Sequence, residues 1–369
     1  MNHVPSNQPS LDHRPSPIPG PAAVLRHLQS AGAFAAYAGA DAPVERIETH
    51  MSWVFLVGEH VLKLKKPVRF PSLDFSTIEA REAFCREEVR LNSRLAPGIY
   101  RGLMAVQWRA GRFNMVPEAL ALKDGVTVDW LVWMHRLPRQ QMLDRRIAES
   151  LVLPTEIDEL VAVLAGFYRS APRIELDAAE HLARFQREQA VSREVLLRPQ
   201  FQLEGASLAL DSLDRALLRN RRKLQERVSR GRIVDGHGDL RPEHVCLLRP
   251  PVVIDCLEFS SQLRQVDPFD ELSFLALECD MAGAAWIGDR LLQGCATALG
   301  DAPPPALQHV YTAYRAVVRA RLAIAHLLDP IPRTPQRWTP LAQRYITHAL
   351  LALEASGRQI NAATPDGSP

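Results

Sequence analysis

The sequence predicts an α+β protein with two lobes, a smaller β-rich lobe followed by a larger helical one. Three observations lead to this prediction. Short apolar runs with turn residues between them indicate strands around 52–66 and 100–118. Helical periodicity dominates after Pro138, and a short β-rich insert at 232–259 interrupts the helices. A chain of 369 residues is long enough for two such lobes with a cleft between them.

The N-terminal lobe is expected to span residues 21–131, after a Pro- and Ser-rich tail at 1–20 that predicts disorder. The Ala-rich segment 22–39 predicts a helix, and "SWVFLVGEHVLKLKK" (52–66) predicts two strands around a Gly-Glu turn. Ser76 and Glu79 match a capping box, which predicts a helix from there to about Leu95.

A connector is expected at residues 132–138, where "DWLVWMHRLP" (129–138) runs from a strand into a linker. The helical lobe then spans 139–356, and residues 357–369 are expected to form a flexible tail. Helical periodicity places helices at 155–169, 177–195, 211–229, 270–282, 304–328 and 338–355.

Composition excludes several classes of protein. A formal net charge of +2 gives no general case for nucleic-acid binding, and the basic run at 217–232 has no aromatic residues among its arginines. No apolar run reaches the roughly 18 residues that a membrane helix needs, and the N-terminus has no apolar signal core. The five cysteines form no CxxC pair, which fits reduced thiols in a cytoplasmic protein.

Two aspartates follow short apolar strands in the β-rich insert. Asp239 belongs to "HGD" after the strand "RIV" (232–234), and Asp255 ends the run "PVVID" (251–255). Carboxylates at the ends of adjacent strands can converge on one site, where one accepts or orients a proton and the other holds Mg²⁺. This division of labour is what phosphoryl transfer requires.

Four stretches together resemble the aminoglycoside phosphotransferase family of the protein kinase-like fold. They are 49–68, 73–100, "HGDLRPEHVCL" (237–247) and "VVIDCLEFS" (252–260), and the resemblance covers about residues 25–350. The chain is most similar to a subgroup whose members often carry a C-terminal P-loop ATPase. It contains no G-x-x-x-x-G-K-[ST] motif, so we expect a stand-alone kinase-like domain.

The resemblance implies ATP and Mg²⁺ as cofactors, with Mn²⁺ as an alternative metal. It makes Asp239 the catalytic carboxylate and Asp255 a metal ligand. Ser52 lies in the loop expected to cover the phosphates, and backbone groups of Trp133 and Met134 are expected to face the adenine.

The same resemblance implies that a strand lysine contacts the phosphates and pairs with a helix glutamate. Lys63 matches best, but Lys65 points to the same face of the strand and remains a rival. Glu88 lies on the apolar stripe of the 76–95 helix, where a carboxylate needs a cation, whereas Glu87 is less well placed.

His244 stands where the family pattern has a metal-binding Asn. Imidazole suits Mn²⁺, Zn²⁺ or Fe²⁺ better than Mg²⁺. His244 therefore binds the metal, or hydrogen-bonds Asp239 or Asp255, or marks a damaged site. We favour a metal ligand in a retuned enzyme, and an inert loop residue is the remaining alternative.

Three further charged residues have two interpretations each. Asp270 begins the helix "DELSFLAL" and is expected to cap it, or to tie down the catalytic loop. Arg315 and Arg319 share a helical face in the lobe that should bind the acceptor, or they pair with nearby acids.

The sequence thus predicts an ATP-dependent phosphotransferase that acts on a hydroxyl group of a small molecule, with no nucleic-acid or membrane partner. The alternative is a nucleotide-binding pseudokinase that regulates without turnover. Neither the acceptor nor the oligomeric state can be predicted. The 155–230 helices lack the acidic cluster that an aminoglycoside would require.

Overall fold

The structure is a computed structural model that describes residues 18–30, 32–39, 42–70 and 73–362. It divides into two compact units. Residues up to Arg90 and Gly98–Arg136 form the N-terminal unit, and Leu91–Pro97 and residues from Leu137 onward form the C-terminal unit. The predicted tail at 1–20 lies outside the described residues except for 18–20. The last helix runs to Ala362, so only residues 363–369 of the predicted tail 357–369 lie outside them.

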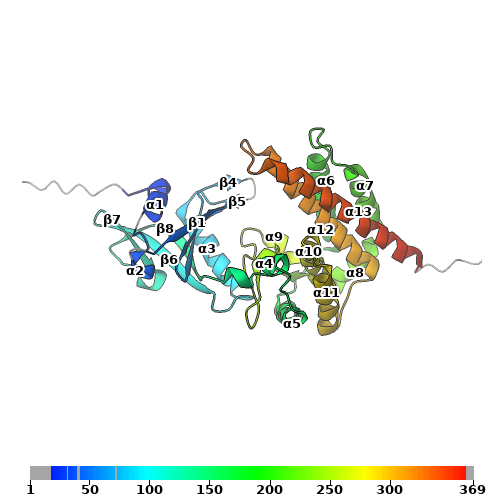
Figure 1. Cartoon of the computed structure of the whole chain (residues 1–369), viewed down its shortest axis with the longest axis horizontal. Coiled ribbons are helices and arrows are strands. Elements are labelled where there is room, and N and C mark those ends of the chain that lie inside the picture. The colour runs from blue at the N-terminus through cyan, green and yellow to red at the C-terminus, as the bar shows by residue number, and fades with distance from the viewer. Residues whose placement is uncertain (1–17, 31, 40–41, 71–72, 363–369) are drawn as a thin grey trace, which may run out of the picture. The chain divides into compact units, whose positions relative to one another are not determined.

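The N-terminal unit is built on a six-stranded sheet with the order β1-β2-β3-β8-β6-β7 (Figure 1). Each neighbouring pair is antiparallel. The strands are β1 (Val44–Glu48), β2 (Ser52–Val57), β3 (His60–Lys65), β6 (Tyr100–Arg109), β7 (Arg112–Pro117) and β8 (Val126–His135). A small hairpin of β4 (Arg69–Phe70) and β5 (Leu73–Asp74) leads to the main helix of this unit.

Helices cover both faces of the sheet. On one face, α1 (Pro21–Leu28) and α2 (Ala35–Ala38) lie over an apolar core that includes Leu62 and Leu64 of β3. On the other face lies α3 (Ile78–Asn92). Because side chains alternate along a strand, Lys63 and Lys65 point to the α3 face.

Two details of the predicted N-terminal helices differ. Residues 22–39 form two short helices rather than one, with Gly32 between them at a φ of +77° that favours glycine. The α3 helix is capped by Thr77, whose hydroxyl accepts from the Ala80 N–H at 3.1 Å. Ser76 instead hydrogen-bonds Asp74, so the predicted capping box does not form there.

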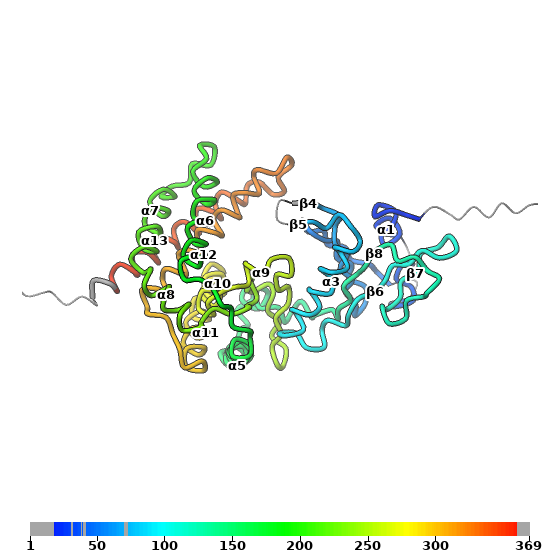
Figure 2. Tube along the Cα trace, turned by 180° about the vertical axis from the view of Figure 1, so that it is seen from behind, coloured from blue at the N-terminus to red at the C-terminus, as the bar shows by residue number. Residues whose placement is uncertain are grey.

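The C-terminal unit is mainly helical (Figure 2). Its longer helices are α4 (Leu143–Ala148), α5 (Pro154–Ser170), α6 (Ala178–Leu196), α7 (Ala206–Arg219), α8 (Arg221–Ser229), α10 (Pro268–Met281), α11 (Ala285–Leu299), α12 (Pro305–Ala325) and α13 (Trp338–Ala362). The predicted helix at 211–229 is two helices, which meet at Asn220.

The α11 helix was not predicted, and its interior glycines explain both the miss and the packing. Glycine disfavours a helix interior, so the segment lacks a helical signal. A Cβ at Gly288 would lie 2.8 Å from the Cβ of Ala276 in α10, and one at Gly294 would lie 2.9 Å from Val161 in α5. The two glycines therefore allow α11 to pack closely against both neighbours.

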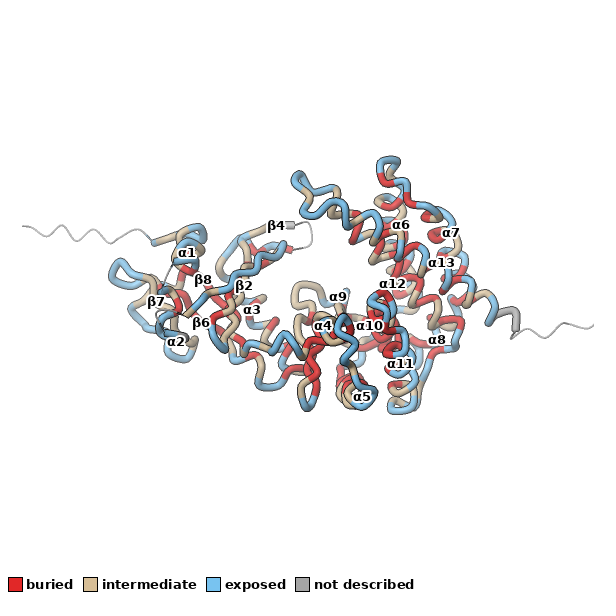
Figure 3. Tube along the Cα trace, viewed as in Figure 1, coloured by how far each residue is buried: buried red, intermediate tan, exposed pale blue. Residues whose placement is uncertain are grey.

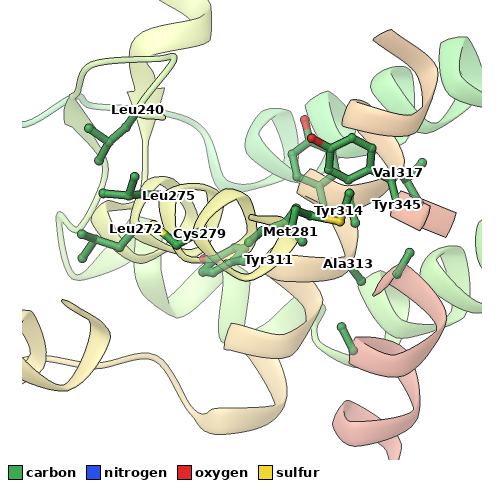
Figure 4. Packing of buried hydrophobic residues seen from close by; sticks show 14 of the residues in the cluster. Leu240, Leu272, Leu275, Cys279, Met281, Tyr311, Ala313, Tyr314, Val317 and Tyr345 are labelled. Atoms are coloured by element: carbon green, nitrogen blue, oxygen red, sulfur yellow. The ribbon is translucent and has the colours of Figure 1, made fainter. Parts of the chain in front are cut away.

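The centre of the C-terminal unit is α10, which is buried along most of its length (Figure 3). It shares a core with α12 and α13, and Leu240 from the loop that precedes it packs into the same cluster (Figure 4). The loop segment also contains two short strand pairs, β9 (Val234–Asp235) with β12 (Gln265–Val266) and β10 (Val245–Cys246) with β11 (Val252–Val253). The strands β9, β10 and β11 lie within the predicted β-rich insert (232–259), whereas β12 follows it.

Two further findings concern the cysteines and membrane helices. All five cysteines are buried free thiols. Among the described residues, no helix has the length and apolarity needed to cross a membrane.

Candidate active site

In the N-terminal unit, two lysines share one buried glutamate. The Nζ of Lys65 lies 2.7 Å from Oε2 of Glu88, and the Nζ of Lys63 lies 2.9 Å from Oε1. Glu88 and Lys65 are almost fully buried, whereas the Lys63 side chain is 15% exposed. The predicted Lys63–Glu88 pair is present, and Lys65 joins it. Glu87 pairs with Arg90 on the surface instead.

The two lysines differ in their surroundings. Lys65 also lies over the ring of Phe75, with 5.2 Å from Nζ to the ring centroid. This contact and its burial fix Lys65 between α3 and the sheet. Lys63 is the more accessible of the two ammonium groups, so it is the better placed to reach a phosphate.

Ser52 lies directly across from Lys65 in the β2–β3 pair. Cross-strand partners point to the same face of a sheet, so the Ser52 hydroxyl belongs to the lysine face. Its Oγ is buried and has no hydrogen-bond partner among the residues that the structure describes. Ser52 is the first residue of β2 and does not lie in a loop, which corrects that part of the prediction, and its role towards the phosphates stays a prediction.

Trp133 and Met134 lie within β8 and not in a linker, which corrects the predicted start of the connector at 132. Both residues pair with β3 on one side and with β6 on the other. The strand β8 continues to His135, so it includes the first four residues of the connector predicted at 132–138. The indole N–H of Trp133 donates to Nδ1 of His60 at 3.2 Å. Contact between their backbone and an adenine stays a prediction.

In the C-terminal unit, a buried carboxylate holds the "HGD" loop from below. Glu271 of α10 accepts hydrogen bonds from the backbone N–H groups of His237 and Gly238 and from the Tyr168 hydroxyl. Burial raises the pKa of Glu271, and these hydrogen bonds oppose the rise. A Cβ at Gly236 would lie 2.5 Å from Val266 and 3.0 Å from Glu271, so only glycine fits that position.

His237 supports the loop by hydrogen bonding. Its Nδ1 accepts from the Asp239 N–H at 3.2 Å, and its Nε2 lies 2.9 Å from the Ile254 carbonyl oxygen. The proton therefore sits on Nε2, and the neutral ring ties the two strand ends together. Burial, with the charge of nearby His244 as the next cause, lowers the pKa of His237 to about 4.

Asp239 is the partly exposed carboxylate that this scaffold presents. Its side chain is 25% exposed, and Oδ2 accepts from Nη2 of Arg241 at 2.9 Å. Arg241 also pairs with Glu243. Burial opposes the charge on Arg241, but the carboxylates of Asp239 and Glu243 outweigh it and raise its pKa. Arg241 therefore stays charged and fixes the orientation of Asp239.

His244 lies between the two aspartates. Its Nδ1 is 2.8 Å from the Asp239 carbonyl oxygen, which can only accept, so Nδ1 carries the hydrogen. Its Nε2 is 3.5 Å from Oδ2 of Asp255. Asp255 has a φ of +63°, a left-handed conformation that Asp tolerates better than most residues, and its side chain is 47% exposed.

These groups fit a divalent cation. Nε2 of His244 and the carboxylate of Asp255 lie 3.5 Å apart and are both groups that bind divalent cations. Arg241 also lies close, with its Nη2 3.4 Å from the same Nε2. One imidazole nitrogen and one carboxylate form a mixed donor set that suits Mn²⁺ at least as well as Mg²⁺.

Other charged residues turn out to be structural. Asp267 caps α10, and Asp270 forms a bidentate pair with Arg315 at 2.7 Å, so neither predicted role of Asp270 holds. Arg319 pairs with Glu278 at 2.8 Å, which supports the interpretation of these arginines as partners of acids. The loop-anchoring Glu271 and the Asp239 partner Arg241 were not assigned from the sequence, although both lie within or beside motifs that it showed.

Three mycobacterial proteins resemble this chain in sequence. They come from Mycobacterium bovis and two strains of Mycobacterium tuberculosis, bear the name "uncharacterized protein", and are 31% identical to it over 328 residues. The match covers 84% of this chain and 61% of each relative, so the chain spans less than two thirds of their length. No family model matches the chain.

Solved structures show the fold. A choline/ethanolamine kinase family protein from Mesorhizobium loti matches with a TM-score of 0.53 at 14% identity, covering 91% of this chain and 98% of that one. The chain has a choline kinase-like fold. Choline kinase from Cryptosporidium parvum matches with a TM-score of 0.52 at 11% identity, covering 92% and 96% of the two chains. This similarity confirms the predicted fold class, an α+β protein kinase-like fold.

Proposed function

We propose that this protein is an ATP-dependent phosphotransferase that transfers the γ-phosphate of ATP to a hydroxyl group of a small molecule. The observation that carries the proposal is the arrangement of Asp239, His244 and Asp255. An anchored, partly exposed carboxylate stands beside a second carboxylate, and an imidazole lies between them. The fold is shared with kinases of small molecules, which supports the same reaction class.

In this proposal the N-terminal unit supplies the groups that bind ATP. Lys63, held with Lys65 by Glu88, neutralises the phosphates of ATP, and the hydroxyl of Ser52 adds a donor on the same face of the sheet. Backbone groups of Trp133 and Met134 hold the adenine. Lysine ammonium groups suit this role because they are compact point charges.

Asp239 acts on the acceptor in the C-terminal unit. Its carboxylate orients the acceptor hydroxyl and takes the hydroxyl proton as the oxygen attacks phosphorus. Arg241 holds Oδ2 of Asp239, so the carboxylate has a fixed direction before the acceptor binds. Asp255 and His244 would hold Mg²⁺ or Mn²⁺, which neutralises phosphate charge when bound.

A pseudokinase is the second candidate, and one observation favours it. The hydrogen bond from Nδ1 of His244 to the Asp239 carbonyl shows that this histidine has a structural partner inside the loop. A histidine committed to the loop, in place of the Asn that the resemblance implies, is compatible with nucleotide binding without turnover.

One experiment separates the two candidates. The purified chain is incubated with ATP and either Mg²⁺ or Mn²⁺, and ADP release is followed against a panel of sugars, hydroxy acids, amino alcohols and antibiotics. Acceptor-dependent ADP release supports the phosphotransferase. Tight ATP binding by calorimetry with no ADP release for any acceptor supports the pseudokinase.

A further inference from the structure

The backbone of Asp255 adopts a conformation that needs support from its surroundings. Its φ of +63° lies in the left-handed region, which a non-glycine residue adopts at some energetic cost. Such conformations persist only where neighbouring contacts fix them, and they are concentrated at functional sites. The contacts that hold this backbone therefore matter for any role of the Asp255 carboxylate.

Main-chain groups of the "HGD" loop and the turn after it hold the chain on both sides of Asp255. The Ile254 N–H donates to the His244 carbonyl oxygen at 2.9 Å, and the Leu257 N–H donates to the His237 carbonyl oxygen at 3.0 Å. These contacts use backbone atoms only, so they depend little on which side chains are present. They leave the peptide directly after Asp255 to be held by another group.

A buried side chain holds that remaining peptide. The N–H of Cys256 donates to Oδ1 of Asn92 at 2.8 Å. Asn92 is the last residue of α3, belongs to the C-terminal unit and is fully buried. Because the peptide bond is planar, the ψ angle of Asp255 sets the direction of the Cys256 N–H. Fixing this N–H therefore fixes the backbone orientation from which the Asp255 carboxylate extends.

The segment that carries Asn92 is itself attached to the other loop of the site. Arg94, two residues further along, donates from its guanidinium to the carbonyl oxygens of Asp235 and Gly236, each at 3.0 Å. These two residues directly precede the "HGD" loop. The segment therefore contacts the chain on the Asp255 side and on the "HGD" side, and Asn92 acts from a fixed position.

We propose that Asn92 is a positioning residue, which aims the carboxylate of Asp255 at the metal by holding the peptide that follows it. Without the amide oxygen of Asn92, the Cys256 N–H would be buried with no acceptor, which is costly in a folded protein. The peptide would turn towards another acceptor, and the left-handed conformation of Asp255 would lose its support. The proposal rests on the proposed function, because it takes Asp255 as a metal ligand of that reaction.

Metal binding tests this inference without turnover. The full chain is titrated into Mn²⁺ and ADP, free Mn²⁺ is counted by electron paramagnetic resonance, and urea unfolding measures stability. Asn92→Leu removes the acceptor at similar volume and should weaken Mn²⁺ binding by about tenfold or more, as for other residues that orient metal ligands. Asn92→Asp retains an oxygen acceptor for the Cys256 N–H and should keep most of the affinity. Asn92→Ala replaces the leucine variant if that variant does not fold.

The control is Asn220→Leu, which makes the same change at a second buried asparagine. Asn220 lies where α7 and α8 meet, and its Nδ2 donates to the Ala216 carbonyl oxygen at 2.9 Å. This variant should lose stability but keep the wild-type affinity for Mn²⁺.

The inference is overturned if the wild type binds no Mn²⁺, or if Asn92→Leu keeps the wild-type affinity. It is also overturned if Asn92→Asp loses as much affinity as Asn92→Leu, or if Asn220→Leu weakens Mn²⁺ binding equally. Failure of the proposed function alone would look different, because Asn92→Leu would still weaken Mn²⁺ binding while the wild type transferred phosphate to no acceptor.

Discussion

The Nε2 atom of His244 lies 3.5 Å from Oδ2 of Asp255, while its Nδ1 is held by the Asp239 carbonyl oxygen. One histidine therefore connects the proposed base and the proposed metal ligand. The orientation of its ring is set by the Nδ1 contact, which directs the second nitrogen at Asp255. An Nε2 atom directed at Asp255 is what a metal-binding His244 requires, whereas an inert loop residue would not require it. The variants below test which interpretation holds.

His244→Asn should shift metal preference from Mn²⁺ towards Mg²⁺, because an amide oxygen is a harder ligand than imidazole. His244→Ala should weaken metal-dependent ATP binding without that shift. Calorimetry with ATP and each metal, and ADP release where turnover occurs, measure both effects. If both variants keep the wild-type metal preference, His244 is a loop residue only. If only His244→Asn turns over ATP, the wild-type protein is a pseudokinase.

Glu88→Ala should destabilise the N-terminal unit by about 3–5 kcal/mol, since it leaves Lys65 buried with its main counter-charge removed. Urea unfolding measures the change. Glu87→Ala on the same helix is the matched control, because its pair with Arg90 is exposed and should be worth less than about 1 kcal/mol. Equal losses in the two variants would show that the buried lysine pair contributes nothing specific.

Stability should fall as the pH drops from 6.5 towards 4. Burial lowers the pKa of His181 and of His237 from 6.5 to about 4, so in this window the unfolded chain takes up protons that the folded chain refuses. Each histidine should cost about 3 kcal/mol over the full window. Above pH 6.5 this contribution is fully present.

His181→Leu tests the pH effect away from the catalytic loop. His181 is buried in α6, its ring meets Phe185 edge-on, and neither ring nitrogen has a hydrogen-bond partner among the described residues. Urea unfolding at pH 7 and pH 5 should show a smaller loss of stability in the variant than in the wild type. An unchanged pH dependence would mean that His181 is protonated readily in the folded state.

Much of the architecture follows from patterns that are local in the sequence. The spacing of Lys63 and Lys65 places both on one face of β3, and the position of Glu88 within the apolar stripe of α3 brings it to them. Local patterns could not decide which of the two lysines pairs with Glu88, because each lysine pairs with one of its two carboxylate oxygens.

Other features depend on contacts that are distant in the sequence. Asp267 is the N-cap of α10, and along that helix Asp270 pairs with Arg315 while Glu271 accepts from the loop. From the sequence alone, Asp270 and Glu271 were equivalent candidates for the residue that anchors the catalytic loop, because the partner of each lies far away in the chain. The α11 helix was missed for a similar reason. Its glycines disfavour a helix locally, and they are explained only by the close packing of α11 against α5 and α10, which are distant in the sequence.

Asp255→Asn should abolish or strongly weaken metal-dependent ATP binding, because it removes the charge of the proposed metal ligand. Asn is preferred to Ala here, since Asn tolerates the left-handed backbone at a φ of +63° and Ala adds strain. Calorimetry of Mg-ATP and Mn-ATP measures the affinity. Unchanged affinity for both would remove Asp255 from the metal site.

The central claim is that Asp239 is the base of a phosphoryl transfer, and transfer of labelled γ-phosphate from ATP to an acceptor tests it most directly. Wild-type protein should transfer label, and Asp239→Asn should bind ATP with nearly the same affinity but transfer label more slowly by a factor of roughly 10² or more. Transfer by Asp239→Asn within a few-fold of the wild-type rate would contradict the account.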